Sequence, residues 1–434
     1  MGRPRIVIVG AGFAGFRAAR RLARIARGRA EIVVINPTDY FLYVPLLPEV
    51  GGGLLDPRRV AVSLPAALPD VRLVLGAVEE IDMGARRVRY RDPEGAGGAT
   101  AYDRLVLAVG SVNKLLPVPG AAEHAHGFRG IPEALYLRDH VIRQMELAAT
   151  AADPAERAAR RTFVVVGAGY TGTEVAAHGV LLTRALARRR PRAGEPARWL
   201  LLDLAPRVLP ELDARMSRTA EHVLRRRGVQ VRTRTSIREA TGEGVRLSDG
   251  TFVPTRTVVW CVGVRPDPLV DGLGLETVKG RLVVGEDLTV PGHPEIYACG
   301  DAAAVPDPAA GPGAVTPMTA QHAVRQGDLA ARNIAASYGD GVRRPYRHRD
   351  LGFVVDLGGA DAAADPLGVP LSGLVAKTVT RGYHLLSLPG NRTRTAADWL
   401  LNVLLGRPTV QLGLVRSPLV PLDTDSPELP LIHH

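Results

Sequence analysis

Two glycine-rich segments of the same design constrain this chain most. Residues 5–15 read RIVIVGAGFAG, and residues 162–172 read TFVVVGAGYTG. In each segment a β-branched apolar run meets a GxGxxG turn before a small-residue helix pattern, which predicts a strand, a tight turn and a helix start. Such a turn lets backbone N–H groups approach a pyrophosphate at the positive end of the helix. Two such turns in one chain predict two dinucleotide cofactors that face each other.

The strand that follows each glycine-rich unit ends in a different residue. The predicted strand Glu31–Ile35 ends before Asn36, and the strand at 199–202 ends before Asp203. In a dinucleotide-binding fold, an acidic residue at this place accepts hydrogen bonds from ribose hydroxyls and repels a 2′-phosphate. Asp203 therefore predicts NADH at the second site, although the nearby Arg207 keeps NADPH open. At the first site, Asn36 can still hydrogen-bond a ribose hydroxyl.

Composition and charge narrow the class of protein. The 434 residues leave room for two or three domains, and 46% hydrophobic with 23% charged residues is typical of a globular chain. No run of about 18 apolar residues occurs, and the chain enters a strand by Ile6 without a signal-peptide pattern, so we expect a cytoplasmic protein. The net charge is +11, but arginine is used throughout and no aromatic-interleaved basic patch occurs, so no nucleic-acid partner is expected.

The two cysteines limit the redox chemistry. Cys261 and Cys299 lie far apart in the sequence, each in an apolar, strand-like context. This pattern disfavours a disulfide scaffold, a cysteine-ligated metal site and a local CxxC redox pair. We expect two buried, inert thiols and no metal site.

Further motifs accompany the two glycine-rich turns. They are NPTDYFLYVPLLPEVGGG at 36–53, TGTE at 171–174, RTVVWCVG at 256–263, IYACGD at 296–301 and MTAQHAVRQG at 318–327. Together with the two turns, these motifs resemble the type II NADH:quinone oxidoreductases, which are single-subunit FAD proteins. The resemblance extends over most of the chain.

The resemblance implies an α/β fold with two Rossmann-like dinucleotide-binding domains, as in glutathione reductase, the first of them discontinuous, plus a short C-terminal module. The expected limits are 1–118 for the first part of the FAD-binding domain, 119–287 for the NAD(P)H-binding domain, 288–365 for the second part of the FAD-binding domain and 366–434 for the C-terminal module. Helices are expected from Phe16 to about Arg27, from Pro132 to about Ala149, and in a segment that ends near Tyr338.

The resemblance also implies the residues of the sites. For the flavin they are Gly10, Gly12, Phe13, Ala14, Gly15, Asn36, Pro45, Leu46, Gly110, Gly300, Asp301, Gln321, His322 and Ala323. For the nicotinamide cofactor they are Gly167, Gly169, Tyr170, Thr171, Gly172, Glu174, Asp203 and Gly263. Glu174 and Gln321 are the expected catalytic residues. The alternative for Glu174 is a first-turn acid that only complements the helix dipole.

The implied reaction takes electrons from NADH through FAD to a quinone-type acceptor. Arg325 stands where the family has a second glutamine, and it would suit a more polar or anionic acceptor. An NAD(P)H-flavin reductase for a ferredoxin-type carrier or a quinone-like natural product therefore stays open, as does an NADH-responsive redox-sensing flavoprotein. Without a CxxC, a disulfide reductase is disfavoured, and the contexts of the cysteines disfavour a sulfide:quinone enzyme.

The region 371–418 reads as two helical or hairpin-like pieces interrupted at 388–391. Its basic residues are Lys377, Arg381, Arg392, Arg394, Arg407 and Arg416, against the single acid Asp398. Its apolar residues are Leu374, Val375, Leu385, Leu386, Trp399, Leu400, Val403, Leu404 and Leu405. Such a mixture predicts either a membrane-surface module, which would place the protein on the inner face of the cell membrane, or a dimer interface. The tail from Asp423 to His434 is expected to be loose.

Overall fold

The first glycine-rich turn follows the central strand of a six-stranded sheet. The computed structural model describes residues 2–189, 196–348 and 351–423, and the strand order of this sheet is β22-β23-β9-β1-β2-β5. Its strands are β1 (Arg5–Val9), β2 (Glu31–Asn36), β5 (Arg72–Leu75), β9 (Arg104–Leu107), β22 (Thr289–Val290) and β23 (His293–Ala298). All neighbours are parallel except β22 and β23. The central strands are almost wholly apolar because both faces of the sheet are covered.

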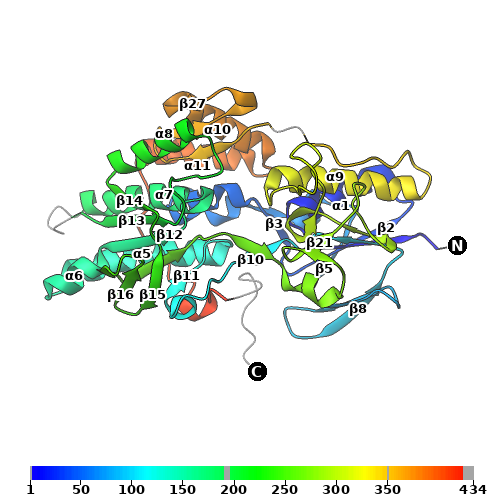
Figure 1. Cartoon of the computed structure of the whole chain (residues 1–434), viewed down its shortest axis with the longest axis horizontal. Helices are drawn as coiled ribbons and strands as arrows, with labels where there is room; N and C mark the ends of the chain where they lie inside the picture. Colours follow the sequence, from blue (N-terminus) through cyan, green and yellow to red (C-terminus); the bar gives the residue numbers. More distant parts are fainter. Residues whose placement is uncertain (1, 190–195, 349–350, 424–434) are drawn as a thin grey trace.

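The second glycine-rich turn occupies the matching place in a five-stranded parallel sheet. The strand order is β11-β18-β12-β13-β14. The strands are β11 (Ala125–His126), β12 (Thr162–Val166), β13 (Arg198–Asp203), β14 (Val229–Thr233) and β18 (Thr257–Trp260). Figure 1 shows the two sheets as the centres of two lobes that lie side by side.

The chain returns to the first sheet after it has completed the second. Ile296 of β23 pairs with Leu105 of β9, which places the later strand beside the earlier one in parallel register. The predicted α/β fold with two Rossmann-like units, the first discontinuous, is therefore confirmed. The residue limits given above for the domains stay a prediction.

Helices cover both sheets. They are α1 (Phe13–Ala26), α2 (Leu47–Gly51), α3 (Leu64–Ala67), α4 (Ala121–His124), α5 (Ile131–Thr150), α6 (Pro154–Arg160), α7 (Tyr170–Arg189), α8 (Ala214–Arg226), α9 (Ala320–Ser337), α10 (Gly373–Ser387) and α11 (Arg392–Leu405). The first helix begins at Phe13, earlier than the predicted start at Phe16, because the glycine turn leads directly into it. α1 packs closely on α9 because Gly327 has no side chain. A Cβ at this position would lie 2.1 Å from the carbonyl oxygen of Ala14.

Short strands and 3₁₀ turns complete the fold. The small sheets pair β3 (Tyr40–Leu42) with β4 (Ala61–Ser63), and β10 (Ser111–Asn113) with β19 (Val264–Pro266). The three-stranded sheets are β6 (Ala77–Asp82), β7 (Arg87–Arg91) and β8 (Gly97–Ala101); β15 (Ile237–Thr241), β16 (Gly244–Leu247) and β17 (Phe252–Pro254); β20 (Thr277–Val278), β21 (Arg281–Val283) and β24 (Ala303–Ala304); and β25 (Val354–Asp356), β26 (Ala362–Ala364) and β27 (Leu371–Ser372). The 3₁₀ turns are η1 (Val44–Leu46), η2 (Pro57–Arg59), η3 (Pro268–Leu273), η4 (Gly300–Ala302), η5 (Pro366–Gly368) and η6 (Ser417–Leu419).

The C-terminal module forms the two predicted helices, α10 and α11, separated at 388–391. In Figure 1 they lie on top of the lobe that carries α7. Two of their side chains are not on the surface where the sequence placed them, because Lys377 is only 3% and Trp399 only 5% exposed. In the described ranges, no helix is long and apolar enough to cross a membrane. The expectation of a loose tail concerns residues 423–434, of which 424–434 lie outside those ranges.

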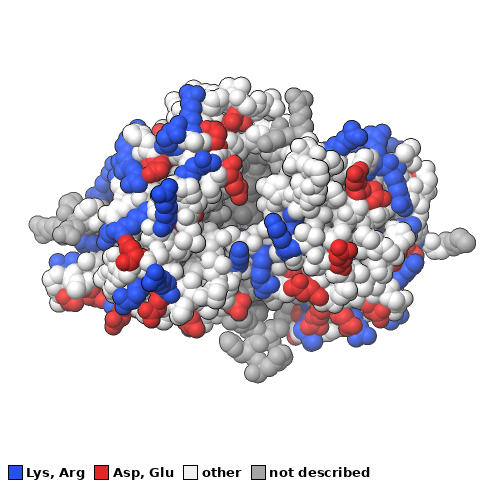
Figure 2. All heavy atoms as spheres, in the orientation of Figure 1, with Lys and Arg blue, Asp and Glu red and all other residues white. Residues whose placement is uncertain are grey.

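The excess positive charge is spread out on the face that Figure 2 shows, where acidic side chains lie among the basic ones. Of the cysteines, Cys299 is buried as expected and Cys261 is half-buried. Burial raises the pKa of both thiols to about 12, so both are protonated at neutral pH.

Candidate functional site

The two glycine turns use their three glycines in the same way. A Cβ on the first or third glycine would strike backbone, at 2.4 Å from Ala108 O for Gly10 and 1.9 Å from Gly10 O for Gly15. In the second turn the same distances are 2.1 Å for Gly167 and 1.9 Å for Gly172. The middle glycines, Gly12 and Gly169, face open space with no described atom within 4 Å of such a Cβ. Each turn is therefore tightly packed behind and open in front.

The open side of each turn is bounded by further glycines and a helix start. Gly110 and Gly263 have left-handed φ angles of +80° and +105°, and nothing in the described chain lies within 4 Å of a Cβ built there. No described side chain caps the start of α1, and neither α1 nor α7 has an acid in its first turn. First-turn N–H groups that face an open cradle fit a pyrophosphate. The residues present therefore fit FAD at the first turn and a nicotinamide dinucleotide at the second.

The strand-tip residues hold the turns in place. Asn36 Oδ1 accepts the N–H of Ala11 at 2.8 Å, and its amide group donates to Thr38. Asp203 accepts the N–H of Ala168 at 2.5 Å and that of Ala205 at 2.7 Å. A carboxylate has about four acceptor positions, so Asp203 retains capacity for two hydroxyl donors. Arg207 instead donates to two backbone carbonyl oxygens, at 2.8 and 2.9 Å.

Replacing Asp203 by alanine should raise the KM for NADH at least about tenfold, because a hydrogen bond to a charged group contributes roughly 1.5–3 kcal/mol. Steady-state kinetics with NADH and NADPH would measure this effect. Asp213→Ala is the matched control, since this aspartate caps α8 through the N–H groups of Arg215 and Met216. An unchanged KM for NADH in Asp203→Ala would remove the ribose assignment.

The segment that returns to the first sheet places Asp301 in the same lobe as the first glycine turn. Asp301 follows β23 in η4 and accepts the hydroxyl of Ser111 at 2.8 Å, while burial raises the pKa of its carboxyl. The N–H of Gly300 donates to Gln326 Oε1 at 2.8 Å. Gln326 therefore ties α9 to η4.

The start of α9 arranges the predicted acceptor residues. Gln321 Nε2 donates to the carbonyl oxygen of Gly352 at 2.8 Å, and its Oε1 accepts from Arg325 at 2.9 Å. His322 is buried, with Nδ1 2.8 Å from the Tyr346 hydroxyl. Ala323 is buried beside Gly300. Arg325 is thus held against Gln321, on the same helix face.

Pro45 and Leu46 lie in η1, immediately before α2, and Leu46 is buried. Phe13 packs edge-on against Phe41, with ring centroids 5.1 Å apart. Ala14 is buried, whereas Tyr170 and Thr171 at the start of α7 are half-buried.

Glu174 lies in the second turn of α7, so it is not the first-turn acid that was the alternative interpretation. It is 9% exposed, and its Oε1 accepts the N–H of Asp356 in β25 at 2.8 Å. Gly352, which binds Gln321, lies four residues before Asp356. One short segment, 352–356, therefore contacts Gln321 at one end and Glu174 at the other.

Asp356 is the centre of a buried ionisable cluster. Its Oδ2 accepts the ammonium of Lys377, and its Oδ1 lies 3.6 Å from His178 Nε2. Ligand-type atoms of Glu49, His178 and Asp356 lie within 4.8 Å of one another. The cluster gathers α2, α7, β25 and α10 at one point.

The environments of the carboxyls in the cluster push their pKa values apart. Burial would raise the pKa of Asp356, but the neighbouring His178 and Lys377 hold it well below its ordinary value. Burial raises the pKa of Glu174 well above its ordinary value, with the charges of Asp356 and Glu49 acting in the same direction. Burial lowers the pKa of His178 to about 4. Burial therefore favours the protonated form of Glu174, whereas Asp356 is ionised and His178 is neutral at neutral pH.

The sequence analysis named Glu174 but did not assign Glu49, His178 or Asp356 to a site, and it placed Lys377 on the surface. A lone charged residue within an apolar helix pattern, such as Lys377 between Val375 and Val379, was the available signal.

Comparison with known proteins agrees with this geometry. Residues 4–327 match the family model for pyridine nucleotide-disulphide oxidoreductases. The chain is 31% identical to the type II NADH:quinone oxidoreductase NdhA of Mycobacterium tuberculosis, over 95% of this chain and 90% of the relative. It is 29% identical to the demethylphylloquinone reductase NdbB of Synechocystis sp., over 92% of this chain and 98% of that protein.

Among solved structures, NDH2 from Plasmodium falciparum in complex with NADH superposes with a TM-score of 0.86. The match covers 94% of this chain and 100% of that one, at 16% identity, and so it shows the shared fold. By its family model and its relatives, this chain belongs to the pyridine nucleotide-disulphide oxidoreductases and, among them, to the type II NADH:quinone oxidoreductases.

Proposed function

We propose that this protein is a FAD-dependent, non-electrogenic oxidoreductase that passes electrons from NADH to a quinone. The observation that carries the proposal is the pair of open glycine cradles, one in each sheet, together with the buried cluster of ionisable groups that includes Glu174. The relatives named for NADH and for quinone or demethylphylloquinone support the same donor and acceptor class.

The chain's own residues position the two cofactors. We assign the cradle of Gly10, Gly12 and Gly15, with Gly110, Gly300 and Asp301, to FAD. The cradle of Gly167, Gly169 and Gly172, with Asp203 and Gly263, is assigned to NADH. When bound, NADH supplies a hydride, and the flavin accepts it and delivers the electrons onward.

The remaining residues serve the acceptor. We place Gln321 at the acceptor site, where its contact with Gly352 links it to the segment that ends at Asp356. Quinone reduction consumes protons, and burial favours the protonated form of Glu174 because it raises the pKa of this carboxyl well above its ordinary value. Glu174 is therefore the proposed general acid. Arg325, held by Gln321, would interact with a carbonyl oxygen of the acceptor.

Anaerobic stopped-flow mixing tests this function. The purified protein, loaded with FAD, is mixed with NADH and then with a short-chain quinone while the flavin absorbance is followed. Rapid bleaching by NADH and rapid recovery with quinone are expected. Bleaching without recovery would contradict quinone as the acceptor and would favour another electron carrier or a redox-sensing role.

We further propose that α10 and α11 attach the protein to a membrane surface. Their exposed apolar side chains include Leu386 and Leu405 at 76%, Val403 at 73% and Leu404 at 68% exposed. Arg392 and Arg394 at the start of α11 are exposed as well. Arg20 of α1 lies near Arg392, and burial together with the charges of Arg24, Arg17 and Arg392 lowers its pKa. Apolar residues beside clustered arginines suit an anionic lipid surface.

Replacing Leu404 and Leu405 by serine should weaken binding to anionic vesicles by at least about tenfold, since each buried leucine contributes roughly 1.5–3 kcal/mol. Co-sedimentation with phosphatidylglycerol vesicles would measure it, and added salt should weaken wild-type binding too. Sedimentation velocity of both forms is the companion measurement. If the double variant bound vesicles normally but lost a dimer, the surface would be a subunit interface instead.

A further inference from the structure

The buried cluster contains a second carboxyl, Glu49, which the proposed function leaves without a role. Glu49 lies in α2 and is 2% exposed. Its Oε2 accepts the indole N–H of Trp399 from α11. In the described ranges its Oε1 has no hydrogen-bond partner, although it is fully shielded from solvent. A buried carboxyl oxygen without a donor favours the protonated form of the group.

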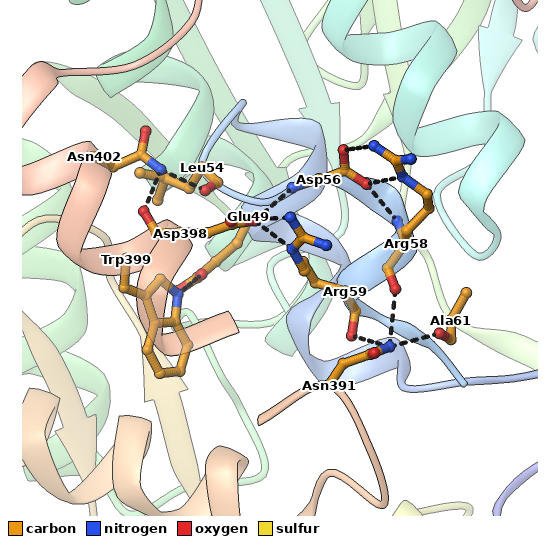
Figure 3. Close-up of polar contacts among 10 residues, drawn as sticks. All are labelled: Glu49, Leu54, Asp56, Arg58, Arg59, Ala61, Asn391, Asp398, Trp399 and Asn402. Carbon is orange, nitrogen blue, oxygen red and sulfur yellow. Dashed lines mark hydrogen bonds and ion pairs between the residues drawn. The ribbon is translucent and has the colours of Figure 1, made fainter. Parts of the chain in front are cut away.

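The indole of Trp399 is fixed by contacts on both sides of it in α11 (Figure 3). Asp398 accepts from Arg59 at 2.9 Å, and Asn402 donates to the carbonyl oxygen of Leu54 at 2.7 Å. The guanidinium of Arg381 lies 4.7 Å from the centroid of the Trp399 ring. These contacts bind α11 to the segment 49–61, so the position of the helix determines where the indole N–H points.

We propose that Glu49 holds the proton that each turnover takes up from solvent, and that Trp399 is the positioning residue that tunes this carboxyl. The proposal rests on the proposed function. In that reaction, NADH + H⁺ + quinone gives NAD⁺ + quinol: NADH is oxidised by loss of a hydride, and the quinone gains two electrons and two protons. The hydride accounts for one proton and both electrons, so one proton must enter from solvent; Glu49 takes it up and passes it to the neighbouring Glu174, the general acid proposed above, which gives it to the quinone. The hydrogen bond from the Trp399 indole thereby sets the pH range of the acceptor half-reaction.

The charged groups around Glu49 suit this role. Asp356 of β25, Lys377 of α10, Glu174 and His178 of α7, and Arg407 after α11 face it. Burial and the charge of Asp356 raise the pKa of Glu49 to about 7, while Lys377 and the Trp399 N–H oppose that rise. A carboxyl with this pKa both takes up and releases a proton near neutral pH. Because Lys377 and Arg407 already supply positive charge, a proton suits the site better than a metal cation.

The test follows reoxidation of the NADH-reduced, FAD-loaded enzyme by a short-chain quinone between about pH 5.5 and pH 9, a range that brackets the titration of a carboxyl whose pKa is raised toward neutrality. In wild type the rate should fall as pH rises through about 7. Trp399→Phe removes the donor that stabilises ionised Glu49, so this fall should move upward by roughly one pH unit. Glu49→Gln should abolish this fall of the rate with pH. It should also slow reoxidation on the acidic side at least about tenfold. Reduction by NADH should be unchanged in both variants.

Two controls separate tuning from a general loosening of the module. Asp398→Asn weakens the Arg59 contact of α11 but keeps the indole N–H of Trp399. Trp260→Phe makes the same change at an indole that donates to the carbonyl oxygen of Lys114, outside the cluster. Both should keep the wild-type pH profile. A profile in Trp399→Phe that matches wild type, or one that Asp398→Asn reproduces, would overturn the proposal.

A second readout needs no turnover. Infrared difference spectra of the FAD-loaded protein should show a protonated-carboxyl band that titrates near pH 7, is lost in Glu49→Gln and titrates higher in Trp399→Phe. Its absence would overturn the role of Glu49 even if quinone reduction proceeds. If wild type shows the band but quinone does not reoxidise the NADH-reduced enzyme, the proposed acceptor is wrong. The assignment of Glu49 as a titrating group then still stands.

Discussion

Replacing Lys377 by methionine is expected to destabilise the folded protein by about 3–5 kcal/mol at neutral pH. Lys377 is 3% and Asp356 5% exposed, and the ammonium of Lys377 donates to Asp356 Oδ2. Without the lysine, Asp356 remains buried as a carboxylate that lacks its counter-ion. Urea unfolding with the same excess of FAD for each form would measure the change in midpoint.

Two comparisons isolate this cause. The double variant Lys377→Met/Asp356→Asn should regain most of the stability, because it removes both charges. In the wild type, the N–H of Gly358 donates to Asp356 Oδ1 at 2.6 Å, and asparagine Oδ1 can still accept this hydrogen bond. Lys114→Met, at an exposed position, should change stability little. Equal losses in the single and double variants would contradict the ion-pair argument and indicate a packing effect.

The pH dependence of this loss has a definite sign. The native pKa of Asp356 lies well below its ordinary value of 3.8, because His178 and Lys377 outweigh the effect of burial. The contribution of the pair to stability is therefore present above pH 3.8 and disappears as pH falls through the lower native pKa. Removing Lys377 raises the pKa of Asp356. The difference between variant and wild type should accordingly narrow as the pH is lowered.

The cofactor cradles could be predicted from the sequence because their geometry is local. Within six residues, Gly10 to Gly15 fix the turn, the open face and the helix start, and Gly167 to Gly172 repeat the arrangement. The two Rossmann-like domains around these turns were expected from the resemblance to the type II NADH:quinone oxidoreductases. The return of β23 to β9 was inferred from a motif, since no local pattern reports strand pairing at that distance.

The buried cluster could not be predicted in this way. Glu49 and Trp399 are 350 residues apart, and Asp356 lies 182 residues from Glu174. In α10 the local pattern is also misleading, since Leu374 and Val375 are exposed whereas Lys377 is buried. This reversal follows from Asp356, whose buried charge needs a cation. Only the tertiary fold brings the two residues together.

Replacing Glu174 by glutamine is expected to slow reoxidation of the reduced enzyme by quinone by about 10²–10⁴-fold, the range for loss of a general acid. In the wild type, Glu174 Oε1 accepts the N–H of Asp356 at 2.8 Å. Glutamine Oε1 can accept the same hydrogen bond, so the local structure should persist. The amide has no proton to release. Stopped-flow traces should show normal bleaching by NADH and slow recovery with quinone.

The stability of the same variant gives an independent check of the sign. Burial raises the native pKa of Glu174 well above its ordinary value of 4.5, so its ionisation favours the unfolded chain as pH rises above that value. Glu174→Gln removes this effect and should unfold at a temperature equal to or higher than wild type at pH 7, with the difference shrinking toward pH 4.5. Glu174→Asp, which keeps an acid but shortens its reach, should recover part of the quinone rate. If Glu174→Gln kept the full rate with this stability signature, Glu174 would be a buried neutral acid without a catalytic role, and the proton would have to come from elsewhere in the cluster.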